Sequence, residues 1–457
     1  MSDPLATSVP TRREVLSGGG VLAAMPTLAA LAPRAHAQGQ QSIRLALVGA
    51  GGRGTGAAAN ALSSKVVPTQ LVAVADVFPD RLANSANQLG RDFGPRAQVP
   101  EERRFLGFDA YRKAIDTLGK GDVVILATPP AFRWPMFAYA IEKGVHVFME
   151  KPVSVDGPSS RRMLDLAAKS EAAKLKVGVG LMCRHCDARG ELFKRIRGGE
   201  IGELLMLRAY RMAGRTAMES SPPKPDNITD LMYQIRRFHS FLWASGGCYS
   251  DYLIHNIDEC CWMKDAWPVK ASATGGRHFR GNSVDQNFDV YSVEYTFADG
   301  AKLFLDGRTM PGCHQEFASY AHGTKGSAVI STAGHMPSHA ATYKGQTPAR
   351  KEDVIWTFGK PEPSPYQLEW DHLFQAILND TPHNEARRGT EASLVTAMGR
   401  MAAHTGQIIT YDQILAHTHE FAPDVDKLSF DSPAPLQPGA DGKYPVPQPG
   451  VTRQREF

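Results

Sequence analysis

The sequence Ile43-Arg-Leu-Ala-Leu-Val-Gly-Ala-Gly-Gly-Arg-Gly54 joins a mostly apolar run to the spacing Gly49-x-Gly51-x-x-Gly54. The apolar run predicts a buried strand, and the glycines predict a tight turn into a helix. A pyrophosphate can approach such a turn closely, because the free N–H groups and the dipole of a helix N-terminus favour negative charge. Glycine is common in this chain, with 42 residues, so the spacing alone fits an ordinary glycine-rich turn equally well.

The acidic residue after the second apolar run supports a nucleotide site. Leu71-Val-Ala-Val-Ala75 ends at Asp76, 22 positions after Gly54. An acid about 20 residues beyond such a turn accepts hydrogen bonds from a ribose. Its carboxylate would repel the extra phosphate of NADP, so the sequence favours NAD. The predicted cofactor contacts of this region are Gly49, Gly51, Gly52, Arg53, Gly54, Asp76 and Arg81.

Strand and helix patterns alternate along the first part of the chain, which predicts a parallel sheet with helices on both faces. Beyond about residue 185 most runs are of β type, which predicts a second domain of α+β type within an α/β protein. The expected strands of the first part are 43–48, 71–75, 122–127, 145–149 and 175–179. Those of the second are 203–213, 268–275, 287–297, 301–309, 315–321 and 326–331.

Four parts of the chain follow from these patterns. Residues 1–37 form a leader, 42–180 the nucleotide-binding domain and 181–431 the second domain, which contains an insertion loop at 214–240. The tail 432–457 is rich in proline, which predicts an extended segment lying over the surface or over a neighbouring subunit.

The leader carries a paired arginine, Arg12-Arg13, before a Gly/Ala/Leu stretch and the small-x-small pattern Ala35-His-Ala37. This arrangement is typical of a twin-arginine signal peptide cleaved after Ala37. We therefore expect the protein to use the twin-arginine export machinery and to work in the periplasm. A stable membrane anchor is disfavoured, because the apolar stretch is short, mildly hydrophobic and broken by Pro26.

The net charge and the cysteine spacing argue against a nucleic-acid-binding protein and against a metal site. The formal net charge is +4 over 457 residues, and no block of Lys and Arg indicates nucleic-acid binding. Six cysteines include Cys183-Arg-His-Cys186, which has the spacing of a redox or zinc site. A second pair at zinc-ribbon spacing does not accompany it, so the sequence predicts no metal.

Two clusters carry candidate chemistry. Lys151 lies in Met149-Glu-Lys-Pro152, directly after a predicted strand, where its ammonium would lie near a nicotinamide and hydrogen-bond a substrate hydroxyl. Asp251 and His255, four residues apart, share one face of a helix predicted at about 251–263. A histidine titrates near neutral pH, which suits a general base, and the carboxylate would orient it. Taken alone, Lys151 also fits a surface lysine, and Asp251 with His255 also fits a surface ion pair.

Together these motifs resemble the glucose–fructose oxidoreductase/inositol dehydrogenase (Gfo/Idh/MocA) family over roughly Ser42 to Leu415. The resemblance implies a Rossmann domain and a C-terminal domain with a large open, mostly antiparallel sheet that often supports dimers or tetramers. It implies that Lys151 and His255 flank the substrate. Other motifs that carry it are Ala127-Thr128-Pro129, Glu150-Lys151-Pro152, Arg197-Gly-Gly-Glu-Ile-Gly-Glu203 and Gly323-Thr-Lys-Gly326.

The resemblance also extends the expected site. Thr128, Pro129, Glu150 and Lys151 would contact the cofactor. Members often have a histidine shortly after the Thr-Pro turn, where this chain has Phe132-Arg-Trp134, so a substrate contact there is not expected. The predicted substrate contacts, chosen as forked donors and aromatic faces for a sugar, are Arg184, Tyr210, Arg236, Trp243, Asp251 and His255. Arg237 and His239 belong to the same segment as Arg236.

The function expected from the family is an exported NAD-dependent oxidoreductase acting on a hydroxyl of a sugar, glycoside or polyol. Hydride would pass to a nicotinamide that stays tightly bound, since the periplasm has no useful nicotinamide pool. One alternative is an NAD-dependent glycoside hydrolase or lyase, which oxidises a sugar transiently, eliminates the aglycone and reduces the sugar again. A second alternative is a sugar-binding protein without catalysis.

Overall fold

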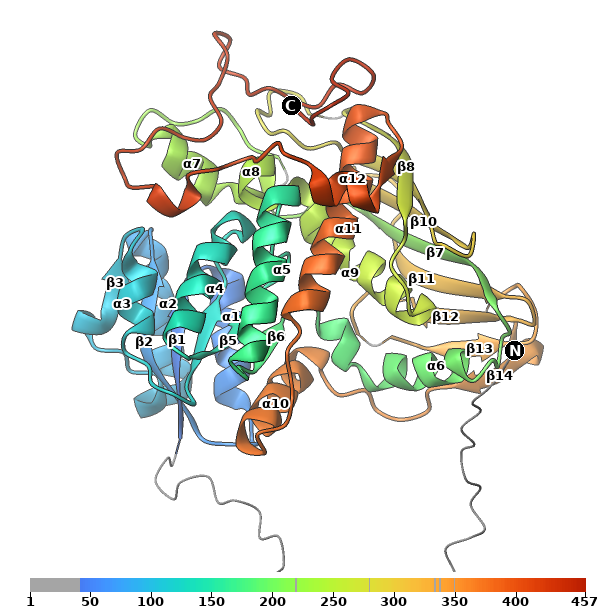
Figure 1. Cartoon of the computed structure of the whole chain (residues 1–457), viewed down its shortest axis with the longest axis horizontal. Helices are drawn as coiled ribbons and strands as arrows, with labels where there is room; N and C mark the ends of the chain where they lie inside the picture. Colours follow the sequence, from blue (N-terminus) through green and yellow to red (C-terminus); the bar gives the residue numbers. More distant parts are fainter. Residues whose placement is uncertain (1–41, 218–219, 279, 333, 337, 349) are drawn as a thin grey trace, which may run out of the picture. The chain divides into compact units, whose positions relative to one another are not determined.

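The computed structural model describes residues 42–457 except 218–219, 279, 333, 337 and 349, so the predicted signal peptide lies outside the described residues. Among the described residues, no helix is both long enough and apolar enough to cross a bilayer. Figure 1 shows the parallel sheet of the nucleotide-binding part in blue and the large second sheet in green to orange.

The first sheet is parallel throughout, with strand order β3-β2-β1-β4-β5-β6. Its helices cover both faces of the sheet, which confirms the predicted α/β class and Rossmann domain. The short β3 was not predicted. The strands are β1 (Ile43–Val48), β2 (Thr69–Asp76), β3 (Arg104–Leu106), β4 (Val123–Leu126), β5 (His146–Met149) and β6 (Val177–Val179). The helices are α1 (Gly52–Ser63), α2 (Pro79–Phe93), α3 (Ala110–Ile115), α4 (Arg133–Glu142) and α5 (Gly157–Ala172).

Among the described residues the second sheet has nine strands in the order β14-β13-β12-β11-β7-β10-β9-β8-β15. Only the β7–β10 pair is parallel, so the expected mostly antiparallel sheet is confirmed. The strands are β7 (Leu204–Ala213), β8 (Lys270–Gly276), β9 (Val290–Thr296), β10 (Lys302–Thr309), β11 (Glu316–Gly323), β12 (Ser327–Ser331), β13 (Ala341–Tyr343), β14 (Val354–Thr357) and β15 (Ile409–Thr410).

Helices α9 (Gly247–Lys264) and α11 (Ala386–Thr405) pack on one face of this sheet. Inward side chains such as Leu207 and Leu303 are fully buried there. On the opposite face Leu205 and Phe304 keep 56% and 40% of their surface exposed. Helix α6 (Asp187–Arg197) packs against α9, and α12 (Tyr411–Ala416) packs against α11 and α5. Helix α10 (Pro365–Leu378) packs against α1 and β6 of the first domain.

The predicted insertion loop contains regular structure. Helix α7 (Asp230–Arg236) begins at Thr229, whose hydroxyl caps it, and α8 (Leu242–Ser245) leads directly into α9. Helix α9 therefore starts at Gly247, four residues before the predicted start at 251, because Gly246 and Gly247 adopt positive φ angles at its entry. These helices bring the polar segment 236–243 against α9.

The proline-rich tail has neither helix nor strand from residue 432 onward and packs on its own chain. Tyr444 donates to Asp230 of α7 at 2.9 Å. At the end of the tail, Glu456 is buried and pairs with Arg400 of α11 at 2.8 Å. The segment thus ties α7 and α11 together.

Candidate active site

In the glycine turn, Gly49 and Gly54 pack closely against other backbone atoms, whereas Gly51 and Gly52 have open space beside them. A Cβ added at Gly54 would come within 1.9 Å of the Gly49 carbonyl oxygen, and Gly49 itself has a φ of +95°. A Cβ at Gly51 or Gly52 would meet nothing within 4 Å. The first pair packs strand against helix, while the second leaves space at the N-terminus of α1 for a pyrophosphate. These residues therefore fit a bound dinucleotide.

Asp76 ends β2 beside this turn. Its two carboxylate oxygens accept hydrogen bonds from the backbone N–H groups of Ala50 at 2.7 Å and Phe78 at 2.9 Å. Burial raises the pKa of the Asp76 carboxyl above its ordinary value. An ionised carboxylate offers about four acceptor positions, so two backbone bonds leave it able to accept from a ribose. Arg81 lies over the Phe78 ring at 4.7 Å and lines the same cavity.

Arg53 and Glu150 act as a pair rather than as separate contacts. Arg53 Nε donates to Glu150 Oε1 at 2.6 Å, and Arg53 Nη2 lies 3.5 Å from Glu369. Burial opposes the charge on Arg53, but the two carboxyl groups outweigh it and raise the pKa of Arg53. Burial, followed by the charge on Glu150, raises the pKa of Glu369 well above its ordinary value. The pair fixes a cation beside the predicted nucleotide.

The turn after β4 continues this lining. Thr128 and Pro129 face the cavity. The guanidinium of Arg133, fully buried, donates to the carbonyl oxygens of Leu126 and of Thr128, the latter at 2.8 Å. Within Phe132-Arg133-Trp134, Arg133 therefore holds the end of the strand, whereas Phe132 lines the cavity.

One cavity of about 640 Å³ runs from the glycine turn into the second domain. We call Gly49–Gly54 with Asp76 its nucleotide end, and Lys151, His239, Asp251 and His255 its far end. The cavity brings together every cofactor contact predicted from sequence, Gly49, Gly51, Gly52, Arg53, Gly54, Asp76, Arg81, Thr128, Pro129, Glu150 and Lys151.

At the far end the carboxylate of Asp251 lies between the ammonium of Lys151 and the imidazole of His239. Lys151 Nζ donates to the Asp251 carbonyl oxygen at 2.6 Å and lies 3.4 Å from Oδ1, and His239 Nε2 lies 3.1 Å from Oδ2. Burial opposes ionisation of Asp251, but Lys151 and His239 outweigh it and hold the pKa of this carboxyl well below its ordinary value. Asp251 therefore stays charged and positions the ammonium of Lys151.

The predicted pairing of Asp251 with His255 differs in the structure. Both lie on α9 at helical spacing, but the Asp251 carboxylate is directed to Lys151 and His239. His255 is 6% exposed, and its Nδ1 has no hydrogen-bond partner among the described residues. Burial, and then the charges of His335 and Lys151, lower the pKa of His255 well below its ordinary value. The imidazole is therefore neutral and open to a proton or another ligand.

Four predicted substrate contacts do not line the cavity. Arg184 is committed to Asp258, with its Nη2 2.8 Å from Oδ1. Trp243 is 0% exposed and donates to Gln234 at 2.6 Å in the core. Tyr210 lies on the open face of the second sheet, 6.3 Å from the ring of Tyr320, because strand residues alternate between faces. Arg236 points outward to Asp80 at 2.9 Å.

Other residues line the far end that sequence reasoning did not select. Arg211 follows Tyr210 on β7, and the alternation of the strand was a usable signal for it. His335 comes from the loop between β12 and β13, Tyr366 from the start of α10, and Tyr252 from α9. Neither His335 nor Tyr366 lies in a motif, so only the tertiary fold places them here.

An open glycine turn and, in the same cavity, a lysine, a charged carboxylate and a neutral histidine define a two-domain, nucleotide-dependent oxidoreductase. Comparison with known proteins agrees. Residues 43–179 match the model of the oxidoreductase family with an NAD-binding Rossmann fold, and residues 191–329 match the GFO/IDH/MocA C-terminal domain. The chain belongs to the GFO/IDH/MocA oxidoreductase family, and its nucleotide is NAD.

Individual relatives are similar over most of the chain. The scyllo-inositol 2-dehydrogenase (NAD(+)) of Bacillus subtilis is 26% identical over 346 residues, 74% of this chain and 87% of the relative. The inositol 2-dehydrogenase of Rhizobium meliloti is 25% identical over 69% of this chain and 84% of its own length. The solved structure of aldose-aldose oxidoreductase from Caulobacter crescentus superimposes with a TM-score of 0.61 at 18% identity, over 81% of this chain and 99% of that one.

Proposed function

We propose that the protein is an exported NAD-dependent dehydrogenase that oxidises a hydroxyl of a sugar, glycoside or polyol. The observation that carries this proposal is the convergence of Lys151, Asp251 and His255 at the far end of the cavity that begins at the glycine turn. The relatives named as inositol 2-dehydrogenases support a polyhydroxylated substrate.

Each residue of the far end has a separate role in the proposed oxidation. Bound NAD supplies the acceptor for the hydride that leaves the carbinol carbon. The ammonium of Lys151, positioned by Asp251, donates a hydrogen bond to the substrate oxygen and favours its alkoxide form. His255, neutral and without a hydrogen-bond partner on Nδ1, accepts the hydroxyl proton. His239 and Tyr252 line the cavity next to Asp251 and would contact the remaining hydroxyls.

Export and retention of the cofactor belong to the same proposal. The twin-arginine leader supports transport of a folded protein to the periplasm, so NAD would be loaded in the cytoplasm and carried across. Tight binding is then required, because periplasmic NAD could not replace what dissociates.

Self-association of the open sheet face completes the proposal. Leu205 and Phe304 expose apolar surface there, and Tyr210 with Arg208 extends the same face. Such a patch is typical of protein–protein contacts. We propose that two or four copies associate through this face, and that Tyr210 serves assembly rather than substrate binding.

The proposal is tested on mature protein purified from the periplasm. We expect NAD to be released on denaturation, and its absorbance to change to that of the reduced form when the folded protein is mixed with inositols, aldoses or glycosides. Protein that carries and binds no nicotinamide nucleotide would refute the assignment. Release of an aglycone without net reduction would identify the redox-neutral hydrolase instead.

A further inference from the structure

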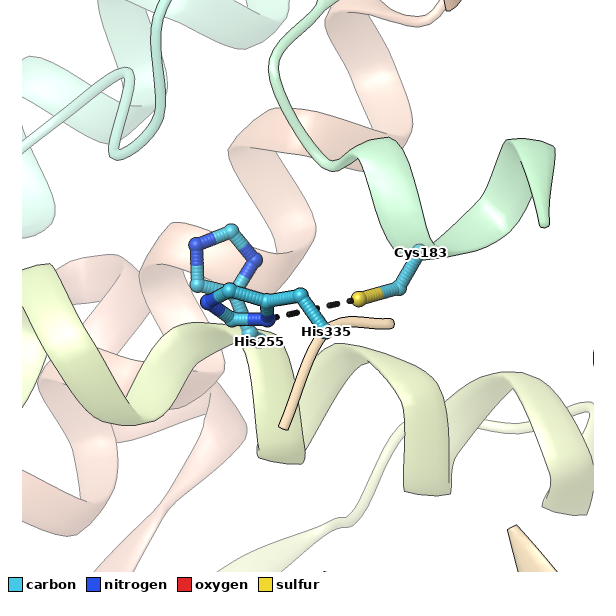
Figure 2. Close-up of side chains that lie close together, drawn as sticks. All are labelled: Cys183, His255 and His335. Carbon is cyan, nitrogen blue, oxygen red and sulfur yellow. Dashed lines mark hydrogen bonds between the residues drawn. The ribbon is translucent and has the colours of Figure 1, made fainter. Parts of the chain in front are cut away.

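Three side chains from distant segments meet beside the far end. Cys183 lies in the short helix Met182–His185, His255 in α9, and His335 in the loop after β12. Their potential ligand atoms all lie within 4.8 Å of one another. In Figure 2 the thiol of Cys183 lies beside the imidazole of His335, whose ring overlaps that of His255 in this view. Cys183 Sγ lies 3.7 Å from His335 Nδ1.

Few hydrogen bonds from the rest of the protein satisfy the polar atoms of these three side chains. His255 Nδ1 is buried without a hydrogen-bond partner among the described residues, and leaving a buried polar atom unsatisfied destabilises the folded state. The rings of His255 and His335 contact each other with centroids 4.4 Å apart. Two imidazoles in such close contact offer two ring nitrogens to one shared ligand, and a neutral ring nitrogen is what binds a metal.

The donor set and its spacing match a transition metal. A thiolate with two imidazoles suits Zn²⁺ better than the hard cations that prefer oxygen. Tetrahedral bonds of about 2.3 Å to sulfur and about 2.0 Å to nitrogen place these atoms about 3.5 Å apart. The separation of Cys183 Sγ from His335 Nδ1, 3.7 Å, agrees with that value.

The surrounding charges permit a cation. Lys151 is paired with Asp251, and Arg189, which lies near Cys183, pairs with Glu259 at 2.8 Å. Arg211 also lines the cavity here. Cys183 would lose its proton on metal binding, and the resulting thiolate offsets this positive charge.

We propose that Cys183, His255 and His335 bind one divalent transition-metal cation, with Zn²⁺ as the best chemical match, and leave its fourth position open to a substrate hydroxyl. Three protein ligands with an open position are typical of catalytic zinc sites. His255 and His335 both line the cavity, which places the open position toward the substrate. The role of the hydroxyl rests on the proposed function; metal binding does not.

Metal binding would change the role of His255 in the proposed reaction. A metal-bound imidazole cannot accept a proton, so in the metal-loaded protein the cation would lower the pKa of the bound hydroxyl, and its proton would pass to water in the cavity instead of to His255. The two roles of His255 exclude each other, and they predict different behaviour for Cys183 and His335, which have no part in the base mechanism.

The test compares metal content and affinity in untagged full-length protein. We expect one equivalent of zinc by mass spectrometry after purification, and a thiolate-to-cobalt absorption band when Co²⁺ replaces it. Cys183→Ser and His335→Gln should each lose more than the ~100-fold in affinity that outer-shell changes cost. Cys186→Ser is the matched control, because it removes the other thiol of the Cys-x-x-Cys sequence and should keep the metal. Circular dichroism checks that each variant is folded.

If Cys183→Ser misfolds, His335→Gln still tests the site, because His335 lies on a loop and is only half-buried. Wild-type protein that binds Zn²⁺ and Co²⁺ no better than Cys183→Ser would overturn the proposal. So would loss of metal in Cys186→Ser together with retention in His335→Gln.

Activity separates this inference from the proposed function. Metal binding without any nicotinamide reduction leaves the cation site standing and removes the dehydrogenase. Equal reduction rates in Zn²⁺-loaded wild type, metal-free wild type and Cys183→Ser remove the catalytic role of the cation and leave His255 as the base.

Discussion

The two ends of the cavity are built on different principles. The nucleotide end comes from consecutive elements, β1, α1 and β2, and depends on backbone shape at Gly49–Gly54. The far end collects side chains from six separate segments, and depends on the contacts that Lys151, His239 and Asp251 make with one another. The nucleotide end is therefore a local property of the chain, whereas the far end exists only once the second sheet has folded against the first domain.

The largest effect should come from Gly54→Ala. The added Cβ would lie 1.9 Å from the Gly49 carbonyl oxygen, so strand and helix must separate, at a cost of about 1–3 kcal/mol or more. We expect lower stability in denaturant titrations and loss of NAD binding. Gly51→Ala is the control, since nothing lies within 4 Å of its Cβ: NAD affinity should fall while the stability of the apoprotein is kept. Equal destabilisation by both changes would contradict the steric account.

His255→Gln should separate the two ends. We expect kcat to fall by about 10²–10⁴, the usual contribution of acid–base catalysis, with NAD affinity unchanged in fluorescence titrations. Tyr249→Phe, on the same helix, loses a buried hydrogen bond to Tyr295 and should lower stability while keeping kcat. A large loss of NAD affinity in His255→Gln would show that the two ends are coupled.

Asp76→Asn tests the charge of the nucleotide end. A hydrogen bond to a charged group contributes about 1.5–3 kcal/mol, so NAD affinity should fall by roughly 10- to 100-fold and discrimination against NADP should shrink. Because burial raises the pKa of Asp76, its carboxylate takes up a proton at a higher pH than a free aspartate. Wild-type affinity should therefore fall as the pH is lowered into the acid range, whereas the affinity of Asp76→Asn should not change. Parallel pH profiles would exclude Asp76 as the titrating group.

The same contrast explains how far sequence alone could go. Gly49–Gly54, Asp76 and the strand–helix alternation are short-range patterns, so the first domain and its nucleotide contacts could be predicted. Asp251 and His255 were found because one helix carries both, but spacing could not show that the carboxylate turns to Lys151 and His239. His335 and Tyr366 reach the far end through long-range packing and leave no local signal.

The smallest expected effect concerns the segment between α7 and α9, where sequence could not tell a pocket residue from a core residue. Trp243→Phe removes the donor to Gln234 and leaves a buried carbonyl unsatisfied, at about 1–3 kcal/mol of stability. Since Trp243 is fully buried outside the cavity, kcat and KM should not change. His239→Gln should do the reverse, raising KM or lowering kcat with little loss of stability, because His239 lines the cavity and pairs with Asp251. A raised KM in Trp243→Phe would show that this tryptophan affects substrate binding, and would contradict its assignment to the core.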